Sequence, residues 1–133
     1  KGPFVAQRAT RQRAGQLVER LGVKLSNLNQ PVTSLSGGNQ QKMVIAKALA
    51  TDPRVLLLDE PTRGIDIGAK SEIHRLIREL VSEGMAVIMV SSVLPELLQA
   101  SDRIMVMKAG RTVAELDARS ATEEEVTRYA FQG

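Results

Sequence analysis

The stretch Leu35–Lys42 places one serine and two glycines directly in front of a helical pattern. Ser36 is a residue type favoured at helix N-caps, and the glycines Gly37 and Gly38 let backbone N–H groups approach a ligand closely. The N–H groups of a first helical turn attract anions, an effect worth about 0.3–1 kcal/mol per charge. A capped loop without a ligand explains the tripeptide equally well, so it indicates only a candidate anion site.

A second candidate cluster is the pair Asp59-Glu60, which follows the apolar run Val55–Leu58. Open α/β sheets bind their ligands at the carboxyl ends of their strands. Asp59 in that place can hold Mg²⁺ through water, and Glu60 can orient or deprotonate an attacking water. A strand followed by an acidic turn is the alternative, and both interpretations remain open at this point.

Two further titratable residues belong to the helical pattern that follows. Asp66, after Gly64-Ile65, stands where a plain N-cap is the simplest interpretation. His74 lies beside the apolar Ile73, and we interpret it as a packing or surface residue rather than a catalytic one.

The elements that must position these residues follow from hydrophobic spacing and from glycine and proline. Helical spacing predicts helices over Ala6–Leu21, from Ser36 to about Ala50, and over Ile67–Glu83, whereas 23–35 is irregular. The runs Val55–Leu58 and Ala86–Val90 are apolar on both faces, which is typical of central strands in a parallel sheet. A short helix near Pro95–Ala100, a hairpin turning at Ala109-Gly110 and a capping box opening at Thr122 complete the pattern.

Composition excludes several classes of protein. The chain has 133 residues, 25% of them charged, no cysteine and one histidine, which excludes a disulfide scaffold and makes a histidine metal cluster implausible. No apolar run approaches the roughly 20 residues that span a bilayer. Because no aromatic residue occurs between residues 5 and 128, the interior offers no stacking platform, and we expect no nucleic-acid partner.

Charge is distributed unevenly along the chain. Residues 1–47 carry eight basic side chains and one acidic one, whereas residues 48–133 carry ten basic and fourteen acidic side chains. The basic part is suited to a polyanion such as a triphosphate, although a solvated helix face explains it as well.

Order and spacing together carry more information than any one motif. Leu35–Gln40, the strand Val55–Asp59 with Glu60, and Gly64–Asp66 resemble the signature motif, the Walker B strand with its catalytic glutamate, and the D-loop of the ATP-binding cassette of ABC transporters. The longer strings 35–42 and 59–66, with 91–96, resemble the second cassette of tandem sugar-import ATPases. The resemblance covers essentially the whole chain.

The resemblance implies an α/β fold: part of the P-loop NTPase cassette, with a parallel sheet and flanking helices. Residues 1–50 are then part of the helical subdomain and residues 51–133 the C-terminal part of the nucleotide-binding core. It also implies ATP and Mg²⁺ as cofactors, with Ser36, Gly37, Gly38, Gln40 and Asp66 binding nucleotide, Asp59 the metal, and Glu60 and Ser92 catalytic.

Two departures from the family pattern qualify this picture. No Gly-x-x-x-x-Gly-Lys-Ser/Thr phosphate loop occurs in the 133 residues, so we expect a fragment that is inactive alone. Ser92 stands at the position of the family's switch histidine, which is usual in these second cassettes and puts hydrolysis at this cassette's own site in doubt.

The implied parent is the ATP-hydrolysing subunit of a bacterial sugar importer, at the inner face of the cell membrane. Its signature would act in trans on ATP held by a second cassette, with transmembrane permease subunits and, indirectly, a solute-binding protein as partners. Two alternatives are a head-domain fragment of a DNA-repair or chromosome ATPase, which the basic N-terminal part favours, and an interaction module without catalysis.

Overall fold

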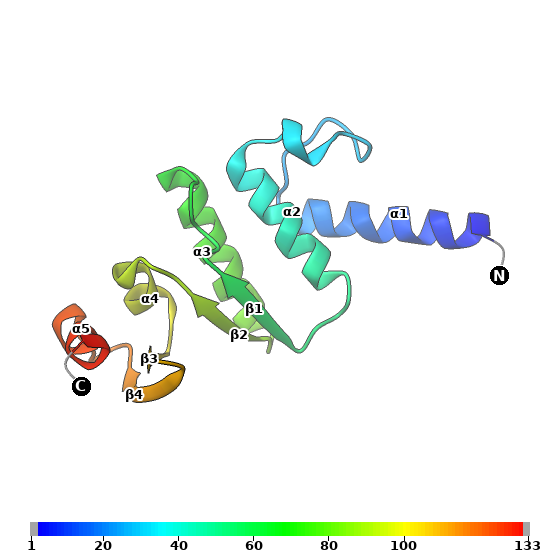
Figure 1. Cartoon of the computed structure of the whole chain (residues 1–133). Coiled ribbons are helices and arrows are strands. Elements are labelled where there is room, and N and C mark those ends of the chain that lie inside the picture. Colours follow the sequence, from blue (N-terminus) through cyan, green and yellow to red (C-terminus); the bar gives the residue numbers. More distant parts are fainter. Residues whose placement is uncertain (1–2, 132–133) are drawn as a thin grey trace. The chain divides into compact units, whose positions relative to one another are not determined.

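The computed structural model describes residues 3–131 and divides the chain into two compact units, 1–88 and 89–133. The boundary falls inside a strand, and each unit has its own set of helices and strands (Figure 1). The boundary predicted at residue 50 separates a helical subdomain from a nucleotide-binding core, which is not the division into these two units. It stays a prediction.

The first unit opens with two helices joined by an irregular segment. Helix α1 spans Pro3–Arg20 and helix α2 spans Gly37–Leu49, with a single 3₁₀ turn, η1, at Val32–Ser34 between them. Helix α1 ends at Gly22, whose φ of 58° is the left-handed conformation that glycine adopts without strain. The N–H of Val23 bonds to Val18 O at 2.9 Å and that of Gly22 to Glu19 O at 3.0 Å, which is a Schellman motif.

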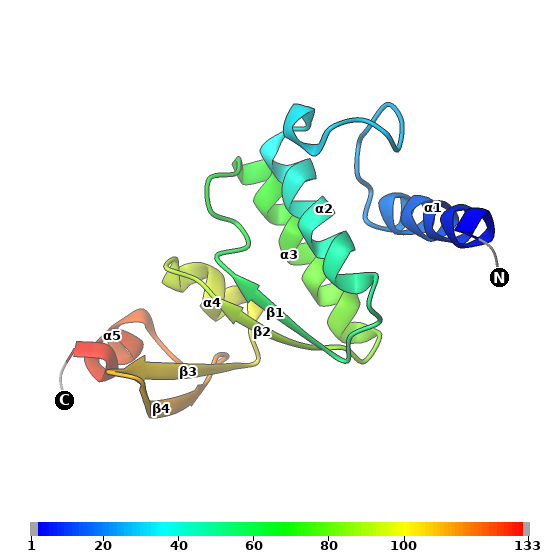
Figure 2. The ribbon, with the colours of Figure 1, turned by 45° about the vertical axis from the view of Figure 1, so that its right-hand side comes forward.

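A strand–helix–strand segment completes the first unit. Strands β1 (Val55–Asp59) and β2 (Ala86–Val90) are neighbours in one two-stranded sheet, and they run parallel (Figure 2). Helix α3 connects them over Ile67–Ser82, and Gly84 with a φ of 95° ends it. The predicted helices and strands of this unit are therefore confirmed, with bounds shifted by a few residues at most.

The core of the first unit lies between α2, α3 and one face of β1. The apolar stripe of α3 is buried, as its helical spacing predicts, and so are the facing residues of α2 and β1. These buried side chains are Ile45, Ala46, Leu49, Leu56, Leu58, Ile73, Leu76, Ile77 and Leu80. Helix α2 packs against both α1 and α3, so the segment in front of α2 is supported from two sides.

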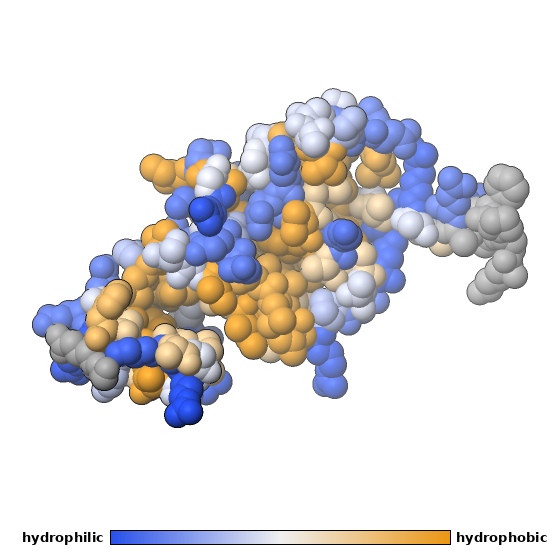
Figure 3. Space-filling model, in the orientation of Figure 1, coloured by the Kyte–Doolittle hydropathy of each residue, from blue (hydrophilic) through white to orange (hydrophobic). Residues whose placement is uncertain are grey.

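The opposite face of the sheet is exposed. Leu57 is 70% exposed, Val55 50% and Ile88 58%, and Figure 3 shows an apolar patch over β1 and β2. The expectation that the apolar runs bury both faces of their strands is therefore wrong for β1, and it is also wrong for β2, in which no residue is fully buried. The alternation of buried and exposed side chains along β1 is that of a strand covered on one face only.

The second unit is a hairpin covered by two helices. Strands β3 (Arg103–Lys108) and β4 (Arg111–Asp117) pair antiparallel, and helices α4 (Leu94–Ala100) and α5 (Glu123–Phe131) accompany them. The turn residues Ala109 and Gly110 have φ values of 49° and 76°, which fit the two left-handed positions of a type I′ hairpin turn. The unit buries Ile104, Val106, Ala118 and Val126.

The predicted start of the last helix is confirmed by its cap. The N–H of Glu125 donates to the hydroxyl of Thr122 at 3.2 Å, the first half of a capping box.

Candidate functional site

The first turn of α2 is built around Ser36, which occupies the N-cap position but does not cap with its side chain. Its hydroxyl accepts a hydrogen bond from Asn39 Nδ2 at 2.9 Å instead, while Asn39 Oδ1 accepts from Lys24 N at 2.9 Å. Asn39 thus ties the serine to the preceding loop. Sequence reasoning missed this residue, whose only signal was its place directly after the two glycines.

The loop in front of α2 is closed by Gln40. Its Nε2 donates to Leu35 O at 2.8 Å, and its backbone N–H donates to Ser36 O at 2.8 Å. The N–H groups that precede it in the first turn have no carbonyl one turn back inside the helix. Ser36 and Gly37 are exposed, so a negatively charged group can approach these N–H groups, and the geometry fits a phosphate.

The two glycines bring α2 against the start of α3. A Cβ at Gly38 would lie 2.5 Å from the Cβ of Ala69, and a Cβ at Gly37 would lie 3.4 Å from Cγ2 of Ile65. A side chain at Gly38 would therefore force the two helices apart. The structure brings together residues 36–38 and 64–69, which the sequence separates by about one helix and one strand.

Asp66 lies inside this junction as the N-cap of α3. Its Oδ1 accepts the N–H of Ala69 at 2.9 Å, so the simple capping interpretation is confirmed. Asp66 is exposed and has a second carboxylate oxygen. Its predicted part in nucleotide binding stays a proposal.

Asp59 and Glu60 follow one another at the carboxyl end of β1. Asp59 is exposed and lies on the same face of the strand as Val55 and Leu57. Glu60 has a φ of 47°, a left-handed conformation that is uncommon for a residue with a side chain, and strained residues of this kind cluster at functional sites. Composition and spacing gave no sign of this conformation.

A tight turn holds Glu60 in place. Its carbonyl accepts the N–H of Arg63 at 3.1 Å, and the next two residues, Pro61 and Thr62, are both buried. The predicted general base is therefore attached to a fixed backbone.

Ser92 belongs to the second unit, where it is exposed and precedes α4. The neighbouring hydroxyl of Ser91 accepts the N–H of Val93 at 3.1 Å. His74 is partly buried on α3.

One ion pair of the first unit joins α2 to α3, one helical turn beyond Gly38. Lys42 Nζ lies 2.7 Å from Glu72 Oε2. The hydrogen bond from Lys42 and its positive charge hold the pKa of Glu72 below its ordinary value.

The structure offers no ready-made metal cage in its described part. No group of three or more His, Cys, Asp or Glu side chains is placed there to hold an ion. Asp59 as a single exposed carboxylate fits Mg²⁺, which keeps several waters and binds through one or two carboxylates together with substrate phosphates.

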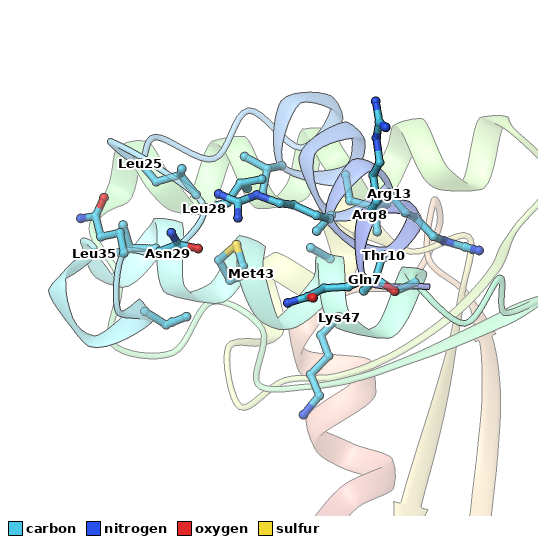
Figure 4. Close-up of a pocket in the computed structure, with 18 residues that line it drawn as sticks. Gln7, Arg8, Thr10, Arg13, Leu25, Leu28, Asn29, Leu35, Met43 and Lys47 are labelled. Atoms are coloured by element: carbon cyan, nitrogen blue, oxygen red, sulfur yellow. The ribbon is translucent and has the colours of Figure 1, made fainter. Parts of the chain in front are cut away.

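A separate cavity of about 1150 Å³ lies between α1, α2 and the loop that joins them (Figure 4). Its lining combines apolar side chains with four basic residues, Arg8, Arg11, Arg13 and Lys47. None of the predicted site residues lines it, so this cavity is separate from the turn Ser36–Gly38.

Part of the chain matches a protein-family model. The model described as ABC transporter matches residues 4–63.

Curated relatives match nearly the whole chain. The ribose import ATP-binding protein RbsA 2 of Rhizobium meliloti (strain 1021) is 54% identical over 123 residues, which are 92% of this chain and 24% of the relative. A ribose/galactose/methyl galactoside import ATP-binding protein of Pseudomonas syringae pv. tomato is 56% identical over 127 residues, 96% of this chain and 24% of the relative. The chain therefore spans about a quarter of the length of the curated relatives it matches.

Solved structures show the same fold. The chain matches cbiO1 of Clostridium perfringens with a TM-score of 0.76 at 32% identity, over 96% of this chain and 50% of that one. It matches the dimeric post-hydrolysis state of the cassette MJ0796, bound to ADP and Pi, with a TM-score of 0.72 at 29% identity, over 86% and 49%.

The class of protein follows from these findings: a P-loop NTPase fold with an exposed glycine turn at a helix start and two carboxylates at a strand end. The chain has the fold of the solved ATP-binding cassettes, and its sequence is similar to those of ABC transporter ATP-binding proteins. Among the described residues, no helix has the length and apolar character needed to cross a membrane.

Proposed function

We propose that this chain serves in an ATP-hydrolysing subunit of a sugar importer, with residues 36–38 and 64–66 facing nucleotide bound mainly by a second cassette. The observation that carries the proposal is the junction of the exposed Ser36–Gly37 turn with the segment around Asp66. The sugar-import relatives at 54–56% identity support the class of substrate.

In this proposal, residues 1–50 are part of the helical subdomain and residues 51–133 part of the nucleotide-binding core. Transmembrane permease subunits, and indirectly a solute-binding protein, are the further partners. The subunit would lie at the cytoplasmic face of the membrane.

The signature turn, which is the segment Ser36–Gly38, contributes electrostatics and position. Its unpaired N–H groups bind γ-phosphate oxygens, and Gly37 allows the close approach because it carries no side chain. The hydroxyl of Ser36, held by Asn39 Nδ2, keeps its own proton free to donate to a phosphate oxygen.

The carboxylates at the end of β1 serve the reaction itself at a second site. Glu60 orients a water and accepts its proton as the water oxygen bonds to the γ-phosphorus and the bond to the bridging oxygen breaks, which leaves ADP and phosphate. Asp59 would hold Mg²⁺, which would neutralise phosphate charge when bound. Ser92 stands at the sequence position of the family's switch histidine, and a serine hydroxyl cannot act toward a γ-phosphate as an imidazole does.

Replacing Ser36 by a large, positively charged residue tests the proposal. In the full-length ATPase assembled with its permease, Ser36→Arg should nearly abolish steady-state ATP hydrolysis, because the side chain blocks approach of the partner's γ-phosphate. Glu60→Gln should be less damaging if the working site is the partner's.

The matched control is Ser26→Arg, the same change at an exposed serine of the 23–35 loop, which should leave the rate unchanged. A rate that survives Ser36→Arg but is lost on Glu60→Gln alone would show that the signature turn does not act in trans.

A further inference from the structure

Lys42 is a buried cation, and the proposed contacts with nucleotide do not explain why it is buried. It is 5% exposed, although it lies on α2 only four residues beyond Gly38. Removing an ammonium group from water is costly unless it is paired and hydrogen-bonded, so the contacts of Lys42 must offset that cost.

Those contacts join three segments of the first unit. Lys42 Nζ donates to Gly22 O, at the end of α1, at 3.1 Å and to Glu72 Oε2, on α3, at 2.7 Å. A cation is favourable at the carbonyl end of a helix and beside a carboxylate. One side chain on α2 therefore binds both neighbouring helices.

The contact between Lys42 and Glu72 lies close to the turn Ser36–Gly38 along α2. Gly38 meets Ala69, and one helical turn further along Lys42 meets Glu72. Two successive contacts between α2 and α3, which lie side by side in Figure 2, fix both the distance and the relative tilt of the two helices.

We propose that Lys42 is a positioning residue for ATP hydrolysis: through Glu72 and the Gly22 carbonyl it holds the Ser36–Gly38 turn in register with the Gly64–Asp66 segment. The two segments then meet the partner's nucleotide as one rigid surface. This inference rests on the proposed function and adds to it a residue that does not touch nucleotide.

The test compares Lys42→Met with the wild type in the full-length ATPase. Met keeps most of the side-chain length and loses the charge and the donors. Since the partner cassette holds most of the nucleotide, we expect kcat to fall about 10-fold to 100-fold from misplacement of the turn, while KM for ATP stays within about 2-fold.

A second variant keeps the test decisive if Lys42→Met does not fold. Glu72 is partly exposed, so Glu72→Gln should fold and should lower kcat without raising KM. In the pair Lys42→Met/Glu72→Gln the effects should not add, because both changes break the same contact. Lys42→Arg, which keeps a cationic donor, should restore part of the rate.

The matched control is the pair Arg75–Glu79, on α3 at 2.7 Å with both side chains exposed. Exposed pairs of this kind contribute little, so Arg75→Met and Glu79→Gln should leave kcat unchanged.

The outcomes separate the two proposals. If Lys42→Met and Glu72→Gln lower the melting temperature but leave kcat intact, Lys42 is merely structural and the inference is overturned. The inference also fails if Arg75→Met costs as much. If Ser36→Arg leaves hydrolysis intact, the proposed function itself fails, whatever Lys42 does.

Discussion

Among the glycines that the structure describes, Gly38 makes the closest approach to a neighbouring segment. Its α-carbon faces Ala69 so closely that an added Cβ would lie 2.5 Å from the Cβ of Ala69. Gly38 is thus required for the packing of α2 against α3.

Gly38→Ala should therefore destabilise the protein by about 1–3 kcal/mol, the usual cost of overpacking. It should also lower ATP hydrolysis, because α2 must move away from α3. Chemical denaturation and steady-state rates measure the two effects.

The compensating variant Gly38→Ala/Ala69→Gly should regain part of both losses. Gly15→Ala is the control, since an added Cβ there meets only Leu28 Cδ1 at 3.8 Å; on a helix it should be neutral or stabilising by about 0.5–1 kcal/mol. Equal losses for Gly15→Ala and Gly38→Ala would contradict the packing argument.

At the scale of elements, the ion pair between α2 and α3 predicts a dependence of stability on pH. The folded-state pKa of Glu72 is lowered from 4.5, chiefly by the hydrogen bond from Lys42. A carboxyl with a lowered folded pKa stabilises the protein above its unfolded pKa, and this contribution is lost as the pH falls through the folded value.

We therefore expect the difference in unfolding free energy between the wild type and Glu72→Gln to be constant near neutral pH and to shrink below pH 4.5. Urea denaturation at a series of pH values measures it. A difference that stays constant down to the acid transition would mean that Glu72 acts only through packing.

The elements were largely predictable because local signals define them. Gly22, Gly84 and Ala109-Gly110 mark ends and turns that the structure confirms with positive φ values, and the apolar stripe from Ile73 to Leu80 is buried as its spacing requires. Helices α1, α2 and α3 needed no knowledge of distant contacts.

The site was predictable only in part, because long-range pairing leaves no local signal. Spacing could not indicate that Lys42 reaches Glu72 and Gly22, or that Asn39 binds the hydroxyl of Ser36. The exposure of Leu57 was wrongly predicted for the same reason. An apolar side chain in a strand is suited to packing against another apolar surface, but the local sequence does not show whether such a surface covers it.

At the scale of the whole molecule, the exposed apolar face of β1 and β2 affects how the chain behaves in solution. Leu57, Val55 and Ile88 together present apolar surface beside a strand with a free edge in the described two-stranded sheet. Surfaces of this kind promote association.

The purified 133-residue chain should therefore self-associate with rising concentration, as light scattering would record. Leu57→Lys should shift the association to clearly higher concentration, while Val44→Lys, at an exposed valine on α2, should not. A clean monomer of the unchanged chain over a wide concentration range would refute this expectation.

The left-handed backbone of Glu60 has a consequence for how this sequence can change over time. Holding a residue with a side chain at a φ of 47° costs about 1–2 kcal/mol relative to glycine. Selection for heat resistance alone would then favour glycine or asparagine at position 60, and either replacement would remove the carboxylate. The proposed chemical role of the Glu60 carboxylate and the stability of the turn that holds it therefore place opposite demands on position 60.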